Sequence, residues 1–317
     1  MIRTSLLAAA FLAVAAAAAA APPYRAPRTA SGAPDLGGLW TNASLTPLQR
    51  PKGFATLTTT EAQARAFEVA VVREFNEEQD GVGGRQSEWW DMGEYMTRIG
   101  GQVRTSLIVD PPDGRLPYNE AGLRRVQEGM SAPIRRFDGP EVRPAPERCV
   151  AGGGGASGVP MFPPRYNGNY MMVQTPEHLA VWSEMGSGVR LIHLKPGTRP
   201  PPSVRLWQGY SAGRWEGETL VVETTNLHPG DTFKTPAPIY ISEHARVVER
   251  FTRISSSEIL YVFEVEDPAA YTRPWRGELV FRATKGPIFE NACHEGNYAL
   301  PGILAGARYE EKQAAGR

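Results

Sequence analysis

Residues 246–254 read RVVERFTRI, and an earlier stretch, residues 219–225, reads TLVVETT. Both are rich in β-branched residues and are typical of strands. In residues 246–254 alternation places Arg246, Val248 and Arg250 on one face and Val247, Glu249 and Phe251 on the other. Charged and large apolar side chains therefore share both faces. Two interpretations stay open: a partly polar interior, as in small-ligand barrels, or a solvated outer face with cross-strand salt bridges.

Similar short segments fill the second half of the chain. The sequence predicts strands at 170–175, 179–184, 189–194, 204–208, 219–225, 246–254, 259–266 and 277–283. No alternation of strands with helices is visible, which disfavours a dinucleotide-binding fold. We therefore predict a mainly β protein, an antiparallel meander that forms a calycin-like or lipocalin-like barrel or a sandwich.

The first half of the chain predicts one or two helices that cover this sheet. Over residues 58–78 the apolar positions Ala64, Phe67, Val71 and Phe75 fall on one helical face, and Thr60 with Gln63 forms a capping box. Residues 119–128 predict a second, short helix, and residues 104–109 a strand. Residues 135–164 are expected to be irregular, because Pro, Gly and charged residues interrupt every apolar run.

Composition narrows the class of protein. Hydrophobic residues make up 41% of the 317 residues, enough for a packed core, and 34 basic side chains balance 34 acidic ones. A nucleic-acid partner is not expected, since such proteins normally carry a basic excess. The sequence gives no indication of the oligomeric state.

The N-terminus predicts export. Arg3 precedes an apolar run from Leu6 to Ala21, which is typical of a signal peptide at residues 1–21. A flexible leader is expected at residues 22–35, followed by a single β domain with a helical N-terminal portion over 36–317. The run is shorter than the roughly 20 residues that a membrane span needs, so no membrane association is expected after cleavage. The predicted location is periplasmic or secreted.

The chain has two cysteines, Cys149 and Cys293. In an oxidising compartment the favoured interpretation is a disulfide, which would connect a central loop to the C-terminal segment. The alternative is a nucleophilic thiol beside His294.

The densest polar cluster is residues 291–298, which read NACHEGNY. His294 can exchange a proton near neutral pH, and Glu295 can orient it or act itself. The alternative is a histidine bonded to a backbone carbonyl at a sheet edge. The metalloprotease pattern fails, since Tyr298 stands at the second histidine position. The five histidines show no zinc-binding spacing, although a metal assembled across strands stays open.

A second candidate is the aromatic and acidic loop with Trp90 and Asp91. It can form a lid, in which Trp90 stacks on an aromatic ligand and Asp91 accepts a proton. The alternative is a buried structural tryptophan.

The sequence resembles a family of secreted bacterial proteins, mostly without assigned activity. The resemblance rests on four strings that extend over most of the chain: SLIVDPPDGRLP (106–117), GRWEGETLVVETTN (213–226), VVERFTR (247–253) and ACHEGNY (292–298). Members often carry a histidine directly before the third string; here Arg246 stands there, with His244 two residues earlier. That departure puts any role of this histidine in doubt for this chain.

The resemblance implies a cofactor-independent lyase that releases formaldehyde from lignin-derived phenylcoumarans by general acid–base catalysis, with an aromatic small molecule as its partner. In this hypothesis His294 and Glu295 form the base, Tyr298 or Arg250 stabilises the phenoxide, and three aromatic side chains hold the substrate rings: Trp90, Trp215 and Tyr166. Two alternatives stay open, a calycin-like binding protein for an apolar ligand and a metal-dependent hydrolase.

Overall fold

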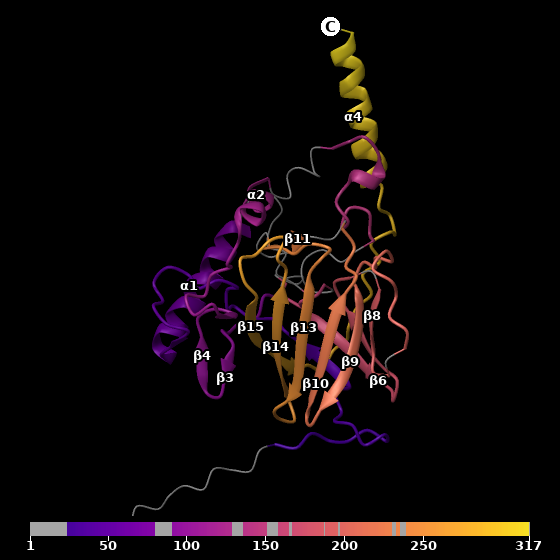
Figure 1. Cartoon of the computed structure of the whole chain (residues 1–317). Helices are drawn as coiled ribbons and strands as arrows, with labels where there is room; N and C mark the ends of the chain where they lie inside the picture. Colours follow the sequence, from indigo (N-terminus) through magenta and orange to yellow (C-terminus); the bar gives the residue numbers. More distant parts are fainter. Residues whose placement is uncertain are drawn as a thin grey trace, which may run out of the picture.

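The structure is a computed structural model that describes residues 24–79, 91–128, 136–150, 158–164, 167–186, 188–195, 197–229, 233–234 and 239–316. Its centre is a closed barrel (Figure 1). The barrel strands are β1 (Gly38–Thr41), β6 (Asn169–Gln174), β7 (His178–Ser183), β8 (Val189–His193), β9 (Tyr210–Glu216), β10 (Thr219–Thr225), β13 (Arg246–Arg253), β14 (Glu258–Glu266) and β15 (Trp275–Ala283). The predicted mainly β fold is confirmed, and the sheet closes as a barrel.

Closure depends on the short first strand. β1 pairs with β6 through Trp40 and Tyr170 and with β15 through Trp40 and Ala283. Neighbouring strands are antiparallel except β8 and β9, which pair in parallel at Ile192 and Ser211. The barrel is therefore mixed, and one step of the expected meander differs.

Smaller elements surround this barrel. β5 (Ile108–Asp110) adds to β15; β2 (Thr58–Thr59), β3 (Arg98–Ile99) and β4 (Gln102–Arg104) form a small sheet; and β11 (Phe233–Lys234) pairs with β12 (Ile239–Tyr240). The predicted strand 104–109 is thus divided between β4 and β5. Residues 204–208 form no strand, only an isolated bridge between Leu206 and Leu227.

The helices are α1 (Glu61–Gln79), α2 (Glu120–Glu128), a short 3-10 helix (Pro140–Val142) and α4 (Ala299–Ala315). α1 begins at the predicted capping box: the Gln63 N–H donates to Thr60 Oγ1 at 3.3 Å, and the Thr60 N–H to Gln63 Oε1 at 3.4 Å. Ala64 is fully buried on its inner face, and Phe67 and Val71 pack beside it. The Phe75 side chain lies outside the described part. α1 and the small sheet lie on the β15 side of the barrel (Figure 1).

Aromatic rings fill the barrel interior. Phe251, Tyr261, Phe263 and Phe281 are fully buried, and the rings of Tyr261 and Phe251 lie 4.9 Å apart between centroids. Tyr261 also contacts Phe281 edge-on at 5.4 Å. Truncating a ring in such a core typically costs about 3–5 kcal/mol. This packing gives the surrounding loops a rigid support.

The predicted disulfide is confirmed. Cys149 and Cys293 are bonded across 144 positions, with their Cα atoms 5.7 Å apart. The bridge fastens the C-terminal segment to the loop after the 3-10 helix. Beyond it α4 extends away from the barrel (Figure 1) and has no buried residue. Arg308 of this helix donates a hydrogen bond to the Phe137 carbonyl.

The described part of the expected leader, residues 24–35, folds back on itself at a bridge between Arg28 and Pro34. Arg28 forms an ion pair with Glu218, and Ala26 is 5% exposed. None of the helices in the described ranges is long and apolar enough to cross a membrane.

Candidate functional site

A cavity of about 300 Å³ lies between the barrel and α1. We call it the apolar cavity. The described residues that line it are Ser44, Leu45, Thr46, Pro47, Leu48, Val71, Met92, Leu107, Phe162, Pro163, Pro164 and Ile239. None of these side chains is charged, and only Ser44 and Thr46 carry a polar atom. A volume of this size is at the lower end of typical small-molecule sites.

One wall of the cavity is the loop 44–48, which follows β1. Backbone hydrogen bonds hold it: the Leu45 N–H donates to the Tyr95 carbonyl at 3.0 Å, and Pro47 accepts from Leu107 at 2.8 Å. The Ile108 N–H donates to the Leu48 carbonyl at 3.0 Å. The wall is therefore fixed to β5 and to the segment before β3.

A second wall is the segment 158–164, which is buried although it has no regular secondary structure. The Met161 N–H donates to Tyr261 Oη at 3.0 Å, and Asn42 Nδ2 donates to the Met161 carbonyl at 3.2 Å. The neighbouring Phe162 contacts Phe263 edge-on at 5.5 Å. Side chains from the barrel thus hold the backbone that lines the cavity.

Tyr261 belongs to a polar network inside the barrel. Its hydroxyl donates to Glu249 Oε1 at 2.6 Å, and Arg190 donates from Nη1 to the same oxygen at 2.9 Å. Glu249 is fully buried and Arg190 is 3% exposed. Arg190 also donates to Ser211 Oγ and Thr224 Oγ1, at 3.1 and 3.0 Å from Nη2. Both open interpretations therefore hold, each for one face of β13: Glu249 makes the interior partly polar, and Arg246 and Arg250 form cross-strand ion pairs on the outer face.

The charges in this network are held by their partners. Burial disfavours the charged form of Arg190, but the adjacent Glu249 carboxylate outweighs it and raises the pKa of the guanidinium. Burial, reinforced by the same carboxylate, raises the pKa of Tyr261 well above its usual value. Tyr261 therefore remains a protonated donor at any physiological pH.

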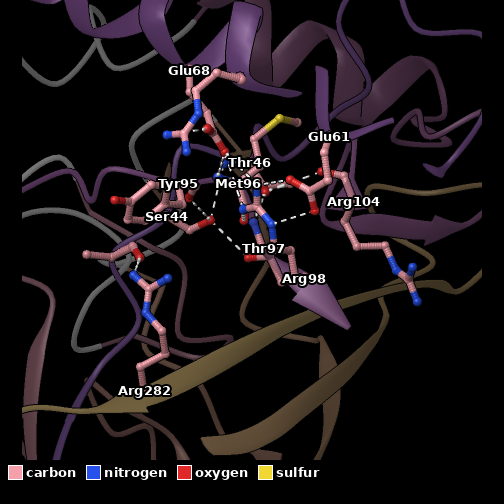
Figure 2. A network of polar contacts seen from close by, with 12 residues as sticks. Ser44, Thr46, Glu61, Glu68, Tyr95, Met96, Thr97, Arg98, Arg104 and Arg282 are labelled. Carbon is pink, nitrogen blue, oxygen red and sulfur yellow. Dashed lines mark hydrogen bonds and ion pairs between the residues drawn. The ribbon is translucent and has the colours of Figure 1, made fainter. Parts of the chain in front are cut away.

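The two hydroxyl groups at the cavity edge are already bonded to the protein (Figure 2). Ser44 Oγ lies 2.9 Å from Thr97 Oγ1, and the Thr97 N–H donates to Thr46 Oγ1 at 2.7 Å. A ligand in the apolar cavity therefore meets mainly carbon atoms.

A second hollow of about 430 Å³, the polar cleft, is lined by the described residues Ala43, Glu61, Arg65, Tyr95, Met96, Thr97, Arg98, Glu258, Val280 and Arg282. Arg98 holds both Glu61 oxygens, at 3.0 and 2.6 Å, and contacts the buried Glu68 at 3.3 Å (Figure 2). These hydrogen bonds lower the pKa of Glu61 and raise that of Arg98. Because Glu61, Glu68 and Arg98 already pair with one another, we take the apolar cavity, and not the polar cleft, as the candidate site.

The predicted catalytic residues at 291–298 lie at the surface. His294, Glu295 and Tyr298 are exposed, Tyr298 by 82%, on the segment between the disulfide and α4. Arg250 is also exposed and forms an ion pair with Glu216 at 3.0 Å. None of the four lines the apolar cavity. Their catalytic roles stay predictions.

The predicted substrate-binding residues are distributed differently. Trp90 and Tyr166 lie outside the described residues. Asp91 is exposed, accepts the Gly93 N–H at 3.0 Å and directly precedes Met92, which lines the cavity. Trp215 is half-buried and packs against the barrel core, not at the cavity. Of the described candidates, Asp91 comes nearest in sequence to the site.

Sequence reasoning missed the residues that form the cavity. Half of them lie in two segments interrupted by proline, Thr46-Pro47-Leu48 and Phe162-Pro163-Pro164. An apolar run that proline excludes from strands is a usable signal, because such a run must bury its side chains outside the sheet.

No protein-family model, no curated protein and no solved structure matches the chain. The site is therefore interpreted from its own geometry.

Proposed function

We propose that this protein is an exported barrel that binds a small, uncharged aromatic or apolar molecule in the apolar cavity. One observation carries the proposal: none of the described residues that line this hollow of about 300 Å³ has a charged side chain. Apolar surface removed from water contributes roughly 25 cal/mol per Å². An ionised ligand would lose hydration there and find no opposite charge among the described lining residues.

The lining also suits a flat ligand. Phe162 offers an aromatic surface, Met92 a flexible and polarisable one, and the prolines Pro47, Pro163 and Pro164 are rigid. Few groups have to become ordered when a ligand enters, and this limits the entropic cost of binding.

A matched pair of fluorescent probes tests the proposal. Phenylnaphthylamine is neutral, and anilinonaphthalene sulfonate has the same ring skeleton with one negative charge. We expect the neutral probe to bind at least about tenfold more tightly, a difference of about 1.4 kcal/mol. Equal binding of both probes, or binding of neither, would contradict the proposal.

Helix α1 provides a variant with a matched control. Val71→Arg places a charge in the cavity wall and is expected to abolish binding of the neutral probe. Val69→Arg makes the same change on the same helix at a side chain that is 61% exposed, and should leave binding intact. Loss of binding in both variants would point to a general effect of charge on α1.

A second candidate function is the formaldehyde-releasing lyase. The observation that favours it is Asp91, a carboxylate one residue from the cavity lining. In this reaction a base removes the proton of the primary alcohol, the carbon–carbon bond breaks to release formaldehyde, and its electron pair forms the new double bond. As this double bond forms, the aryl ether carbon–oxygen bond breaks and its electron pair leaves with the oxygen, and the resulting phenoxide takes up a proton.

Purified protein incubated with a phenylcoumaran alcohol decides this candidate. Stilbene and formaldehyde in equal amounts, without added cofactor, support the lyase. Asp91→Asn and His294→Ala then distinguish the two possible bases. Tight substrate retention without product supports a binding protein instead.

The proposal includes export of the protein through an N-terminal signal peptide. A disulfide fits an oxidising compartment. Residues 1–21 are proposed as the signal peptide, so the exported protein should begin after Ala21 when its N-terminus is sequenced.

No observation favours the metal-dependent hydrolase. Across the described ranges, no three His, Cys, Asp or Glu side chains form a group that could hold a metal ion.

A further inference from the structure

The wall formed by residues 158–164 raises the question of what fixes its position. All seven residues are buried, and none belongs to a helix or strand. Buried backbone groups without a ladder partner must be satisfied by side chains or water. The groups that satisfy them therefore determine where Phe162, Pro163 and Pro164 face the apolar cavity.

Met161 is the point of attachment. Its N–H bonds to Tyr261 Oη at 3.0 Å, and its carbonyl to Asn42 Nδ2 at 3.2 Å. Tyr261 comes from β14, and Asn42 directly follows β1. The next residue, Phe162, packs its ring parallel to that of Trp275, with centroids 6.5 Å apart.

The orientation of the Tyr261 hydroxyl is fixed from the other side. Its proton is donated to Glu249 Oε1 at 2.6 Å, so the oxygen presents its lone pairs to the Met161 N–H. Glu249 is bound by Arg190, and Arg190 is bound in turn to Thr224 at 3.0 Å. The network thus connects β8, β10, β13 and β14 to the cavity wall.

We infer that Tyr261 is a positioning residue of the apolar cavity: its hydroxyl, ordered by Glu249, holds Met161 and thereby sets the wall that faces the ligand. The inference rests on the proposed function. Tyr261 is not among the residues that line the cavity, so its effect is transmitted through the segment 158–164.

The test is Tyr261→Phe in the full-length protein. This variant keeps the ring and removes the hydroxyl, which leaves the buried Met161 N–H without its acceptor. We expect faster hydrogen exchange in residues 158–164 and about tenfold weaker binding of phenylnaphthylamine, equivalent to about 1.4 kcal/mol. Ile259→Val is the matched control, because Ile259 is buried two residues earlier on the same strand and carries no polar group; it should leave both measurements unchanged.

Unchanged exchange, or faster exchange with unchanged affinity, would overturn the inference. If Tyr261→Phe does not fold, Thr224→Val removes a hydroxyl at the far end of the network and should shift both measurements in the same direction by less. If the unmodified protein fails to bind the probe, the proposed function is wrong and the effect on affinity falls with it. The exchange rates then report separately whether Tyr261 holds the wall.

Discussion

Two polar regions of this molecule differ in how they are built. The segment 291–298 is a continuous polar string, and the structure places His294, Glu295 and Tyr298 in solvent. The network of Arg190, Glu249 and Tyr261 draws single residues from three strands, and all are buried. A continuous run of polar residues in the sequence therefore did not indicate where polar side chains gather in the structure.

The difference has an energetic basis. In solvent, a charged or polar side chain keeps its hydration, and an exposed ion pair typically contributes about 0–1 kcal/mol. Inside the barrel the same groups lose water, and each depends on its partner. A substitution is therefore expected to have a large effect in the buried network and a small one in the exposed segment.

The largest effect is expected at Glu249. Glu249→Leu leaves the Arg190 guanidinium buried without its carboxylate and should lower the free energy of unfolding by about 3–5 kcal/mol. Urea denaturation measures this. Combining Glu249→Leu with Arg190→Met should recover most of the loss, because no charge is then buried alone; a double variant as unstable as the single one would contradict the explanation.

The disulfide joins the exposed segment at Cys293 to Cys149, and its removal ranks second. The disulfide constrains the unfolded chain over 144 positions. Replacing Cys149 and Cys293 by serine removes this constraint, so the free energy of unfolding should fall by about 2–4 kcal/mol. The comparison is thermal unfolding of the double variant against the oxidised protein. A smaller loss would mean that the disulfide between Cys149 and Cys293 constrains the unfolded chain little.

Tightness of the barrel interior is tested by Gly277→Ala. A Cβ atom at this position would lie 2.3 Å from Cζ of Phe263, so the ring must move, at a cost of about 1–3 kcal/mol. Gly197→Ala is the control, since no atom lies within 4 Å of its Cβ position. Similar unfolding midpoints for both variants would show that the interior is looser than described.

The smallest effect is expected at His294. Its side chain is exposed, and His294→Ala should change the unfolding free energy by no more than about 0.5 kcal/mol. A larger loss in urea denaturation would show that the segment 291–298 packs more firmly than its exposure indicates. The same variant, assayed for formaldehyde release, reports on the lyase hypothesis independently of stability.

Strand alternation predicted most of the barrel. The segments that became β6, β7, β8, β10, β13, β14 and β15 are rich in β-branched or aromatic residues, which suit a half-buried sheet. β1 (Gly38–Thr41) is only four residues long, and β9 (Tyr210–Glu216) contains Gly213 and Ala212 at positions where a strand signal needs large side chains. Both strands are specified by their neighbours more than by their own residues.

The helix α4 was missed for a related reason. Pro301, Gly302 and Gly306 interrupt the helical pattern, so the sequence predicts no helix over these residues. The disulfide could be predicted because the chain has two cysteines and an N-terminus that predicts export. The apolar cavity could not, because its walls come from segments that lie far apart in the sequence, among them residues 44–48 and 162–164.

The bridge between Cys149 and Cys293 has one more consequence. Every barrel strand from β6 to β15 lies between these two residues, and only β1 lies outside. The disulfide therefore closes a covalent loop that contains eight barrel strands, and the ninth strand, β1, joins the barrel from outside this loop. A protease that cuts one hairpin within the loop yields two pieces that still migrate together, and they separate only when a reducing agent is added.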